Sequence, residues 1–211
     1  MRIICLWCLA TLLSCSRTEP RIPYGVMKLV YYQEQSRQEE RFSFFVLAED
    51  DDGIENLEAL SLYHDREGLC WALSAEDWIA LEEDEKTWIG SRAIAMPGSE
   101  TLPRGQYRAV LENKGGEKTA RTITFDAPET PRYPFPAFTL EGRRYTVESG
   151  YPEHFFLCYN QAGALVQTLW LEALEGDLRN LNLSSEAKTL ALWAEDEEYQ
   201  TAALTDIQII P

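Results

Sequence analysis

The chain has 211 residues and carries 35 aspartate and glutamate side chains against 19 lysine and arginine side chains, for a formal net charge of −16. Such an acidic surface repels nucleic acid phosphates and anionic lipid headgroups, which excludes DNA, RNA and polybasic membrane contacts as binding modes. The sequence holds two histidines and contains no P-loop, dinucleotide fingerprint, nucleophile elbow or HExxH zinc motif. These features predict a protein that is not an enzyme and uses no cofactor.

The N-terminal residues have the layout of an export signal. Met1-Arg2 supplies one positive charge, and Ile3–Ser14 is an uncharged, mostly apolar run. A run of about a dozen residues is well short of the roughly 20 that a bilayer-spanning helix needs. A short positive start followed by a short apolar core is typical of a secretory signal.

The end of this run carries a more specific motif. Leu12-Leu13-Ser14-Cys15 resembles the lipobox of bacterial lipoproteins. The resemblance implies cleavage before Cys15, attachment of acyl chains to that residue, and anchoring to a membrane of the cell envelope through the lipid. Ser16 directly after the cysteine favours the outer membrane by the same resemblance. An ordinary secretory signal with an incidental cysteine is the alternative.

Proline placement predicts two domains. Asp126–Pro136 holds four prolines in eleven residues, and such a run is typical of a stiff, extended linker. We expect a signal peptide at 1–14, a lipidated tether at 15–23, an immunoglobulin-like β-sandwich at 24–126, the linker at 127–136 and a smaller β-domain at 137–211. A proline-rich crossing within one larger sandwich is the alternative.

The first domain is predicted to contain about seven strands and one short helix. Its apolar and β-branched runs are separated by turn residues. The expected strands are Val26–Tyr32, Arg41–Ala48, Leu57–Tyr63, Leu69–Leu73, Arg92–Met96, Gln106–Glu112 and Lys118–Phe125. Ser74 with Asp77 three residues later imitates a capping box and Trp78 opens an apolar side, so we expect a helix near 75–82.

Two segments of this domain resemble immunoglobulin-like and fibronectin type III-like modules of exported bacterial proteins. Phe42–Leu62 (FSFFVLAEDDDGIENLEALSL) looks like a B strand, an acidic loop and a C strand. Leu102–Tyr107 (LPRGQY) looks like the corner ahead of strand F, where a tyrosine hydroxyl bonds back to the backbone. The strand pattern and the resemblance together predict an all-β chain of two β-sandwich domains.

The second domain also has a β pattern. The expected strands are Phe138–Leu140, Tyr145–Val147, His154–Tyr159, Ala164–Leu171, Leu178–Leu183, Thr189–Ala194 and Leu204–Ile210. At roughly 75 residues this domain is small for a self-sufficient core, so we expect it to lean on the first domain.

Two cysteines are expected in the body of the protein. Cys70 and Cys158 both have apolar neighbours in the sequence, so we expect both thiols to be buried. We expect them to be free because they belong to different predicted domains. A disulfide between them is the alternative that an exported protein allows.

The acidic loop Glu49–Glu55 raises the question of calcium. Placing Gly53 at the sixth position of a helix-loop-helix calcium loop puts Ala48 and Ala59 where the first and last ligands belong, so that pattern fails. We expect a simple Asp-Gly turn here. A calcium loop of another kind is the alternative.

Tryptophans are the candidate binding residues. Large aromatic side chains serve both cores and interfaces, and the candidates after the signal are Trp71, Trp78, Trp88, Trp170 and Trp193. Trp78 and Trp88 flank the acidic stretch Glu82–Glu85, so we expect these two to be exposed and to bind a partner.

These features lead to one expected function and two alternatives. We expect a lipid-anchored, non-catalytic envelope protein that binds a partner protein or serves in assembly. The alternatives are a solute- or glycan-binding lipoprotein, and a hydrolase that uses surface carboxylates. An exposed patch around Trp78 and Trp88 would favour the first function, whereas a concave, aromatic-lined cleft would favour solute or glycan binding.

Overall fold

The computed structural model describes residues 18–34, 37–97 and 101–211, in which it places sixteen β-strands and two 3-10 turns. The all-β prediction is confirmed. Cys15 and the predicted signal peptide lie outside the described residues. The first strand begins at Arg21, so the last three residues of the expected tether at 15–23 belong to the sheet. No helix within the described ranges is long and apolar enough to cross a membrane.

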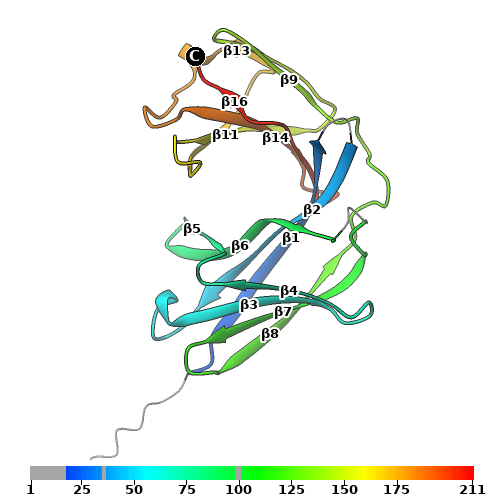
Figure 1. Cartoon of the computed structure of the whole chain (residues 1–211), viewed down its shortest axis with the longest axis vertical. Coiled ribbons are helices and arrows are strands. Elements are labelled where there is room, and N and C mark those ends of the chain that lie inside the picture. Colours follow the sequence, from blue (N-terminus) through cyan, green and yellow to red (C-terminus); the bar gives the residue numbers. More distant parts are fainter. Residues whose placement is uncertain (1–17, 35–36, 98–100) are drawn as a thin grey trace, which may run out of the picture.

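The first half of the chain forms a sandwich of two sheets (Figure 1). One sheet contains β1 (Arg21–Glu34), β2 (Arg37–Glu49), β6 (Lys86–Ala95) and β5 (Ile79–Glu83), in that spatial order. The other contains β4 (Leu69–Ser74), β3 (Leu57–His64), β7 (Gly105–Asn113) and β8 (Lys118–Phe125). When the strands are lettered in the order in which they occur in the chain, the spatial orders of the two sheets are A-B-E-D and C′-C-F-G. This is an immunoglobulin-like arrangement.

Alternating side chains build the core of this sandwich. In β7, Tyr107, Ala109 and Leu111 are buried while their neighbours are more exposed, because successive residues of a strand point to opposite faces. Phe42 of β2 meets them from the facing sheet. Its ring lies edge-on to Tyr107 and Phe125, with centroids 5.2 Å and 4.7 Å apart, a geometry that aromatic pairs prefer.

The predicted tyrosine corner is present before β7. The Tyr107 hydroxyl donates a 2.6 Å hydrogen bond to the carbonyl oxygen of Pro103. Arg104, in the same corner, forms a two-pronged ion pair with Glu40 of β2, with both N–O distances at 3.1 Å. Arg104 also donates to the carbonyl of Pro128. The corner therefore joins β2 and the start of the proline-rich segment to the facing sheet.

The second half of the chain forms a smaller sandwich. One sheet contains β13 (Glu175–Asp177), β10 (Arg144–Glu148) and β9 (Ala137–Glu141). The other contains β12 (Leu165–Trp170), β11 (Glu153–Tyr159), β14 (Thr189–Asp196) and β15 (Thr201–Leu204), with β16 (Gln208–Ile209) paired to β14. With the same lettering, the spatial orders of these two sheets are E-B-A and C′-C-F-G. Phe138, Tyr145 and Phe156 pack together between them.

One continuous sheet joins the two sandwiches. β1 extends beyond the first sandwich and pairs in parallel with β15, with Leu29 opposite Thr201 and Tyr32 opposite Leu204. The resulting strand order is β12-β11-β14-β15-β1-β2-β6-β5. Figure 1 shows the long β1–β2 hairpin reaching from the lower sandwich into the upper one. The second half therefore leans on the first through backbone hydrogen bonds, which fix the angle between the halves.

The proline-rich segment 127–136 contains no strand, in keeping with its prolines. It is fastened to the second sandwich at more than one point. The Tyr133 hydroxyl donates a 2.6 Å hydrogen bond to Asp196 Oδ2, and the Arg132 guanidinium lies 3.8 Å from the centre of the Tyr199 ring. The segment is thus held against the protein and supports the fixed angle between the sandwiches.

The predicted helix near 75–82 is wrong. The capping hydrogen bonds do form, because Ser74 Oγ donates to Asp77 Oδ2 at 2.6 Å and the Ser74 backbone N–H donates to the same oxygen at 3.2 Å. They close a turn instead of opening a helix, and residues 79–83 pair with β6 as strand β5. A capping box is a local signal, and pairing with a sheet edge outweighs it here.

Two strand predictions in the second half also need correction. Leu178–Leu183 is not a strand, since Leu178–Asn180 forms a 3-10 turn in which the Asp177 carboxylate accepts the Arg179 N–H. The strand at this point is β13, just before the turn. Leu204–Ile210 is not one strand, because its residues are divided between the end of β15 and β16.

The two cysteines differ in their surroundings. Both are free, but Cys70 is exposed and only Cys158 is buried. The predicted burial of Cys70 is wrong because β4 is an edge strand whose alternate side chains, including Cys70, face solvent. Burial raises the pKa of the Cys158 thiol to about 11.

Candidate functional site

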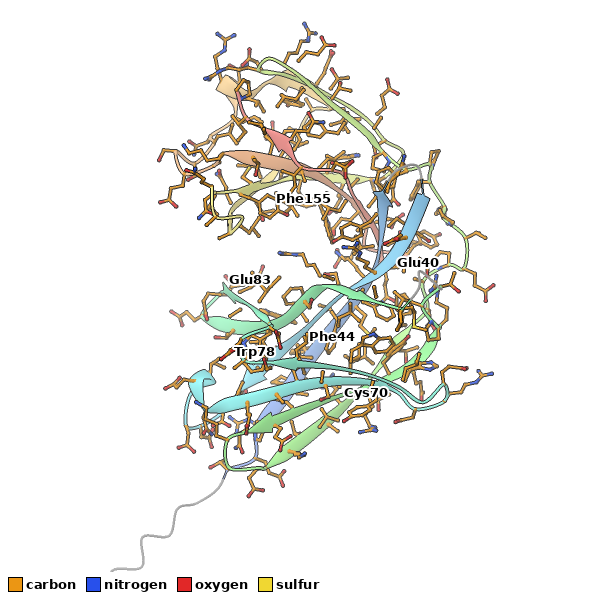
Figure 2. The ribbon with its side chains drawn as sticks, viewed as in Figure 1. Glu40, Phe44, Cys70, Trp78, Glu83 and Phe155 are labelled. Carbon is orange, nitrogen blue, oxygen red and sulfur yellow. The ribbon has the colours of Figure 1, made fainter. Side chains whose placement is uncertain are left out.

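A cleft of about 460 Å³ lies between the two sandwiches, where one part of the shared sheet faces another. Its lower wall is the outer face of β1, β2, β6 and β5, and its upper wall is formed by β11, β12 and β14. Figure 2 shows Phe155 on the upper wall and Glu83 on the β5–β6 hairpin below it. A volume of this size is typical of small-molecule sites.

Aromatic side chains form the upper wall. Phe155 and Trp193 line the cleft from adjacent strands. Phe155 is paired with Trp193 across β14 and with Trp170 across β12, and directly paired residues place their side chains on the same face of a sheet. Trp170 is 61 % exposed. The three rings therefore lie in a row across this face, from the buried Trp193 at 8 % exposure to the exposed Trp170.

The lower wall carries a second pair of aromatic side chains. Phe45 of β2 and Trp88 of β6 both line the cleft, with Leu81 of the edge strand β5 beside Trp88 in register. Adjacent residues such as Ile89 point the other way, into the first sandwich, where Ile89 is fully buried. The outer face of this sheet thus carries an apolar strip beside its charged and polar residues, although it does not belong to the core of the first sandwich.

The structure separates the two predicted binding residues and leaves neither of them exposed, so the expected exposure is wrong. Trp88 is partly buried and lines the cleft. Trp78 is also partly buried, but it packs against the core cluster of the first sandwich. Trp88 thus contributes to the cleft, while Trp78 contributes to the sandwich core. Trp193, among the sequence candidates, also lines the cleft.

An ion pair at the cleft connects the two sandwiches. Lys28 Nζ of β1 lies 2.6 Å from Glu195 Oε2 of β14. The Trp193 indole N–H donates to the same oxygen at 2.6 Å. The Lys28 and Glu195 side chains are 25 % and 13 % exposed, so water screens this pair less than it screens a surface pair. This contact positions the Trp193 ring and neutralises the most buried carboxylate of the cleft.

Arg92 is the second cation of the cleft and has a different environment. Its guanidinium lies 5.5 Å from the centre of the Phe45 ring. In the part of the chain that the structure describes, no carboxylate pairs with this guanidinium, and its other electrostatic neighbours are the neutral phenols of Tyr32 and Tyr159. Burial lowers the pKa of Arg92 from its usual value. A partly buried cation without a counter-ion is costly, so it marks a place where an anion would be stabilised.

The hairpin at the rim of the cleft is strained. Asp84 and Glu85 join β5 to β6 and both adopt positive φ angles, of 49° and 61°. A two-residue hairpin loop of this kind normally contains glycine or asparagine, and each non-glycine residue in this region costs roughly 1–2 kcal/mol. The pairing of β5 with β6 offsets this strain and places Leu81 and Glu83 at the cleft.

The acidic loop forms the predicted Asp-Gly turn. The Gly53 N–H donates to the Asp50 carbonyl at 3.0 Å, and Gly53 takes a φ of 93°. Asp50 Oδ1 accepts from the Asp52 N–H and from Asn56 Nδ2, at 2.8 Å and 3.1 Å. Its carboxylate is thus occupied within the turn. Among the described residues no group of three or more His, Cys, Asp or Glu side chains is placed to hold a metal ion.

A second hollow of about 360 Å³ lies beside the tyrosine corner. His64 is buried there, with its ring 4.7 Å from the Tyr107 ring and its Nε2 3.3 Å from the Arg104 carbonyl. Asp65 does not orient this histidine, because it pairs with Arg108 at 2.7 Å. The Arg108 hydrogen bond lowers the pKa of Asp65. This arrangement resembles packing around the corner more than a catalytic pair.

No protein-family model matches the chain, and no curated protein matches it. Solved structures similar to it include dimeric latent PorU from Porphyromonas gingivalis, with 13 % identity, a TM-score of 0.34, and coverage of 92 % of this chain and 20 % of that one. Tp47, the 47-kilodalton lipoprotein of Treponema pallidum, has 10 % identity and a TM-score of 0.32 over 90 % of this chain and 51 % of that one.

A third similar structure is Dpr11 IG1 bound to DIP-gamma IG+IG2, with 10 % identity, a TM-score of 0.27, and coverage of 90 % of this chain and 98 % of that one. This chain spans one fifth of the PorU chain and about half of the Tp47 chain. The fold of the chain is an immunoglobulin-like β-sandwich arrangement, as its strand order shows.

Proposed function

We propose that this protein is a non-catalytic binding protein of the bacterial envelope that takes a carbohydrate-sized ligand in the cleft between its sandwiches. The observation that supports the proposal is the concave shape of the site, with the partly exposed Trp88 and Phe155 on opposite walls and the buried Phe45 and Trp193 rings beside them. Aromatic walls stack on flat, weakly polar rings such as sugars, and a few polar groups then fix the orientation of the ligand.

The polar groups of the cleft favour binding over hydrolysis. Glu195 is already engaged by Lys28 and by the Trp193 indole, whereas a general acid must be free to donate its proton to a leaving group. Glu83 and Glu197 also line the cleft and are exposed, so they can accept hydrogen bonds from ligand hydroxyls.

A cleft-blocking variant tests this proposal. Thr168 is an exposed residue of β12 that lines the cleft, so Thr168→Trp would fill the site from a position outside the core. Thr124→Trp, at an exposed position of β8, is the matched control. We expect the detergent-solubilised full chain to bind members of an immobilised panel of neutral and acidic glycans. Binding should fall at least tenfold in Thr168→Trp and persist in Thr124→Trp.

The proposal fails if no glycan of the panel binds the wild-type chain. It also fails if Thr168→Trp and Thr124→Trp bind the same glycans as strongly as the wild type, because the ligand would then lie elsewhere.

Lipid anchoring at Cys15 is part of the proposal and rests on the lipobox resemblance. Five residues, 16–20, separate this cysteine from the start of β1. Fully extended they reach roughly 18 Å, at about 3.3–3.6 Å per residue, so the first sandwich would stay close to the membrane. We expect Cys15→Ala to be exported but to lose its fractionation with membranes. Retention of Cys15→Ala in washed membranes would contradict the anchor.

A partner protein is the second candidate ligand. Exposed apolar side chains flank the cleft, with Val26 on its lower wall and Trp170 beside Phe155 at its open side, at 51 % and 61 % exposure. A protein surface would cover such residues. Crosslinking in the native envelope from a photoreactive residue at position 168, followed by mass spectrometry, tests this candidate. A single captured protein would favour it, and crosslinks to glycan alone would contradict it.

A further inference from the structure

The cleft contains one positive charge that the protein leaves unpaired. Lys28 is matched by Glu195, whereas the Arg92 guanidinium lies over Phe45 without a carboxylate partner among the residues described. Other partly buried arginines of this chain are paired, as Arg104 is with Glu40. Because burial of an unpaired charge is costly, Arg92 is the group of the cleft with the most to gain from a bound anion.

The geometry points to an acidic carbohydrate as the ligand, with a ring carboxylate paired to Arg92 and sugar faces on the aromatic walls. This inference rests on the proposed function, since it names the class of ligand for the same cleft. A guanidinium presents a planar set of donors that matches a carboxylate with two parallel hydrogen bonds. The ligand carboxylate would thus supply the counter-ion that the Arg92 guanidinium lacks within the described protein.

The remaining polar lining suits hydroxyl groups. The carboxylates of Glu83 and Glu197 can only accept hydrogen bonds, whereas the hydroxyls of Ser43 and Thr168 can both accept and donate them. A sugar offers several hydroxyl donors around each ring, so one ligand would serve these acceptors and Arg92 together. A peptide segment offers one backbone N–H for each residue and would leave more of the cleft's acceptors without a donor. The lining therefore favours an acidic sugar over an acidic peptide.

The net charge of −16 does not oppose this inference at short range. At physiological ionic strength exposed charges are screened beyond roughly 8 Å. Within the cleft the nearest buried carboxylate, Glu195, is neutralised by Lys28 at 2.6 Å. A ligand carboxylate at Arg92 would thus meet a local cation. The exposed Glu83 and Glu197 of the same cleft would weaken its binding, and the acidic surface would slow its approach.

Matched probes test the inference. We propose calorimetric titration of the detergent-solubilised full chain, in 150 mM salt, with a galacturonic acid tetramer and with its fully methyl-esterified form. The two probes share ring shape and most hydroxyls and differ in charge. We expect the acid to bind at least tenfold more tightly than the ester. Arg92→Gln should abolish that preference, while Arg66→Gln, at an exposed position far from the cleft, should retain it.

A stability readout separates recognition from a structural role. Removing an unpaired, partly buried charge should leave the melting temperature of the free protein unchanged or raise it. Loss of the acid preference in Arg92→Gln together with an unchanged or higher melting temperature supports the inference. A large fall in melting temperature would show that Arg92 is a structural residue, and would overturn it.

The outcomes for the inference and for the proposed function are distinct. If acid and ester bind with equal affinity and Thr168→Trp abolishes the binding of both, the acidic class of ligand is wrong. Carbohydrate binding in the cleft is then still supported. Tight binding of a hexaglutamate peptide in competition with the tetramer overturns the carbohydrate class. Failure of both tetramers and of every glycan of the panel to bind overturns the inference and the proposed function together.

Discussion

Lys28 Nζ and Glu195 Oε2 lie 2.6 Å apart although 167 positions separate them in the chain. Lys28 belongs to β1 of the first sandwich and Glu195 to β14 of the second, so this ion pair crosses from one sandwich to the other at the cleft. Together with the pairing of β1 and β15, it holds the two walls at a fixed separation. The cleft is therefore a consequence of how the sandwiches are joined.

Lys28→Met should destabilise the protein by about 2 kcal/mol, because it leaves the Glu195 carboxylate partly buried without its cation. Adding Glu195→Gln to Lys28→Met should recover part of this loss. Urea unfolding of the single and double variants measures both effects. Lys118→Met, which breaks the more exposed pair with Glu112, is the control and should change stability little. Equal losses in Lys28→Met and Lys118→Met would contradict the importance of the cleft pair.

Tyr107→Phe should cost about 1–2 kcal/mol, because the Tyr107 hydroxyl is paired with the Pro103 carbonyl and the residue is 1 % exposed. Thermal melts of the variant and the wild type measure the loss. Tyr63→Phe, on the neighbouring strand β3, removes a hydroxyl outside the corner and is the matched control. An unchanged melting point for Tyr107→Phe would show that the corner bond contributes nothing to stability.

Cys70 and Cys158 should differ strongly in reactivity. Cys70 is exposed, whereas burial raises the pKa of Cys158 to about 11, so almost no Cys158 thiolate exists at pH 8. Brief alkylation of the native full chain followed by peptide mapping should label Cys70 and spare Cys158, and labelling in denaturant should modify both. Comparable native labelling of the two positions would contradict the buried placement of Cys158.

His154 should make stability depend on pH in the mildly acidic range. Burial lowers the pKa of His154 below its usual value of 6.5, so the unfolded chain binds a proton that the folded chain resists. This contribution is complete above pH 6.5 and is lost as the pH falls from 6.5 toward the folded pKa. We expect His154→Gln to flatten the melting temperature between pH 7 and pH 5. Parallel pH profiles for His154→Gln and the wild type would contradict this.

Most strands and the tyrosine corner could be predicted from the sequence, because these features depend on residues that are close together in the chain. Gly105–Asn113 alternates in burial as its apolar pattern predicts, and Tyr107 reaches a carbonyl only four residues away. The edge strand β5 was not predictable, because Ile79–Glu83 becomes a strand only by pairing with β6. A local capping signal at Ser74 pointed to a helix instead.

The cleft itself could not be predicted from local patterns. Its two walls come from strands that are far apart in the chain, such as Phe45 in β2 and Phe155 in β11. The parallel pairing of β1 with β15 brings them together, and no short motif encodes that register. Trp88 and Trp193 could be recognised as candidate aromatic anchors, whereas an unpaired Arg92 becomes visible only once the neighbouring carboxylates are located.

The most direct test of the central claim is a crystal structure of the full chain soaked with the galacturonic acid tetramer. We expect electron density for sugar rings between Trp88 and Phe155, with a carboxylate within hydrogen-bond distance of the Arg92 guanidinium. Density for the tetramer at any other surface, with the space between Trp88 and Phe155 occupied by solvent alone, would contradict the proposed site.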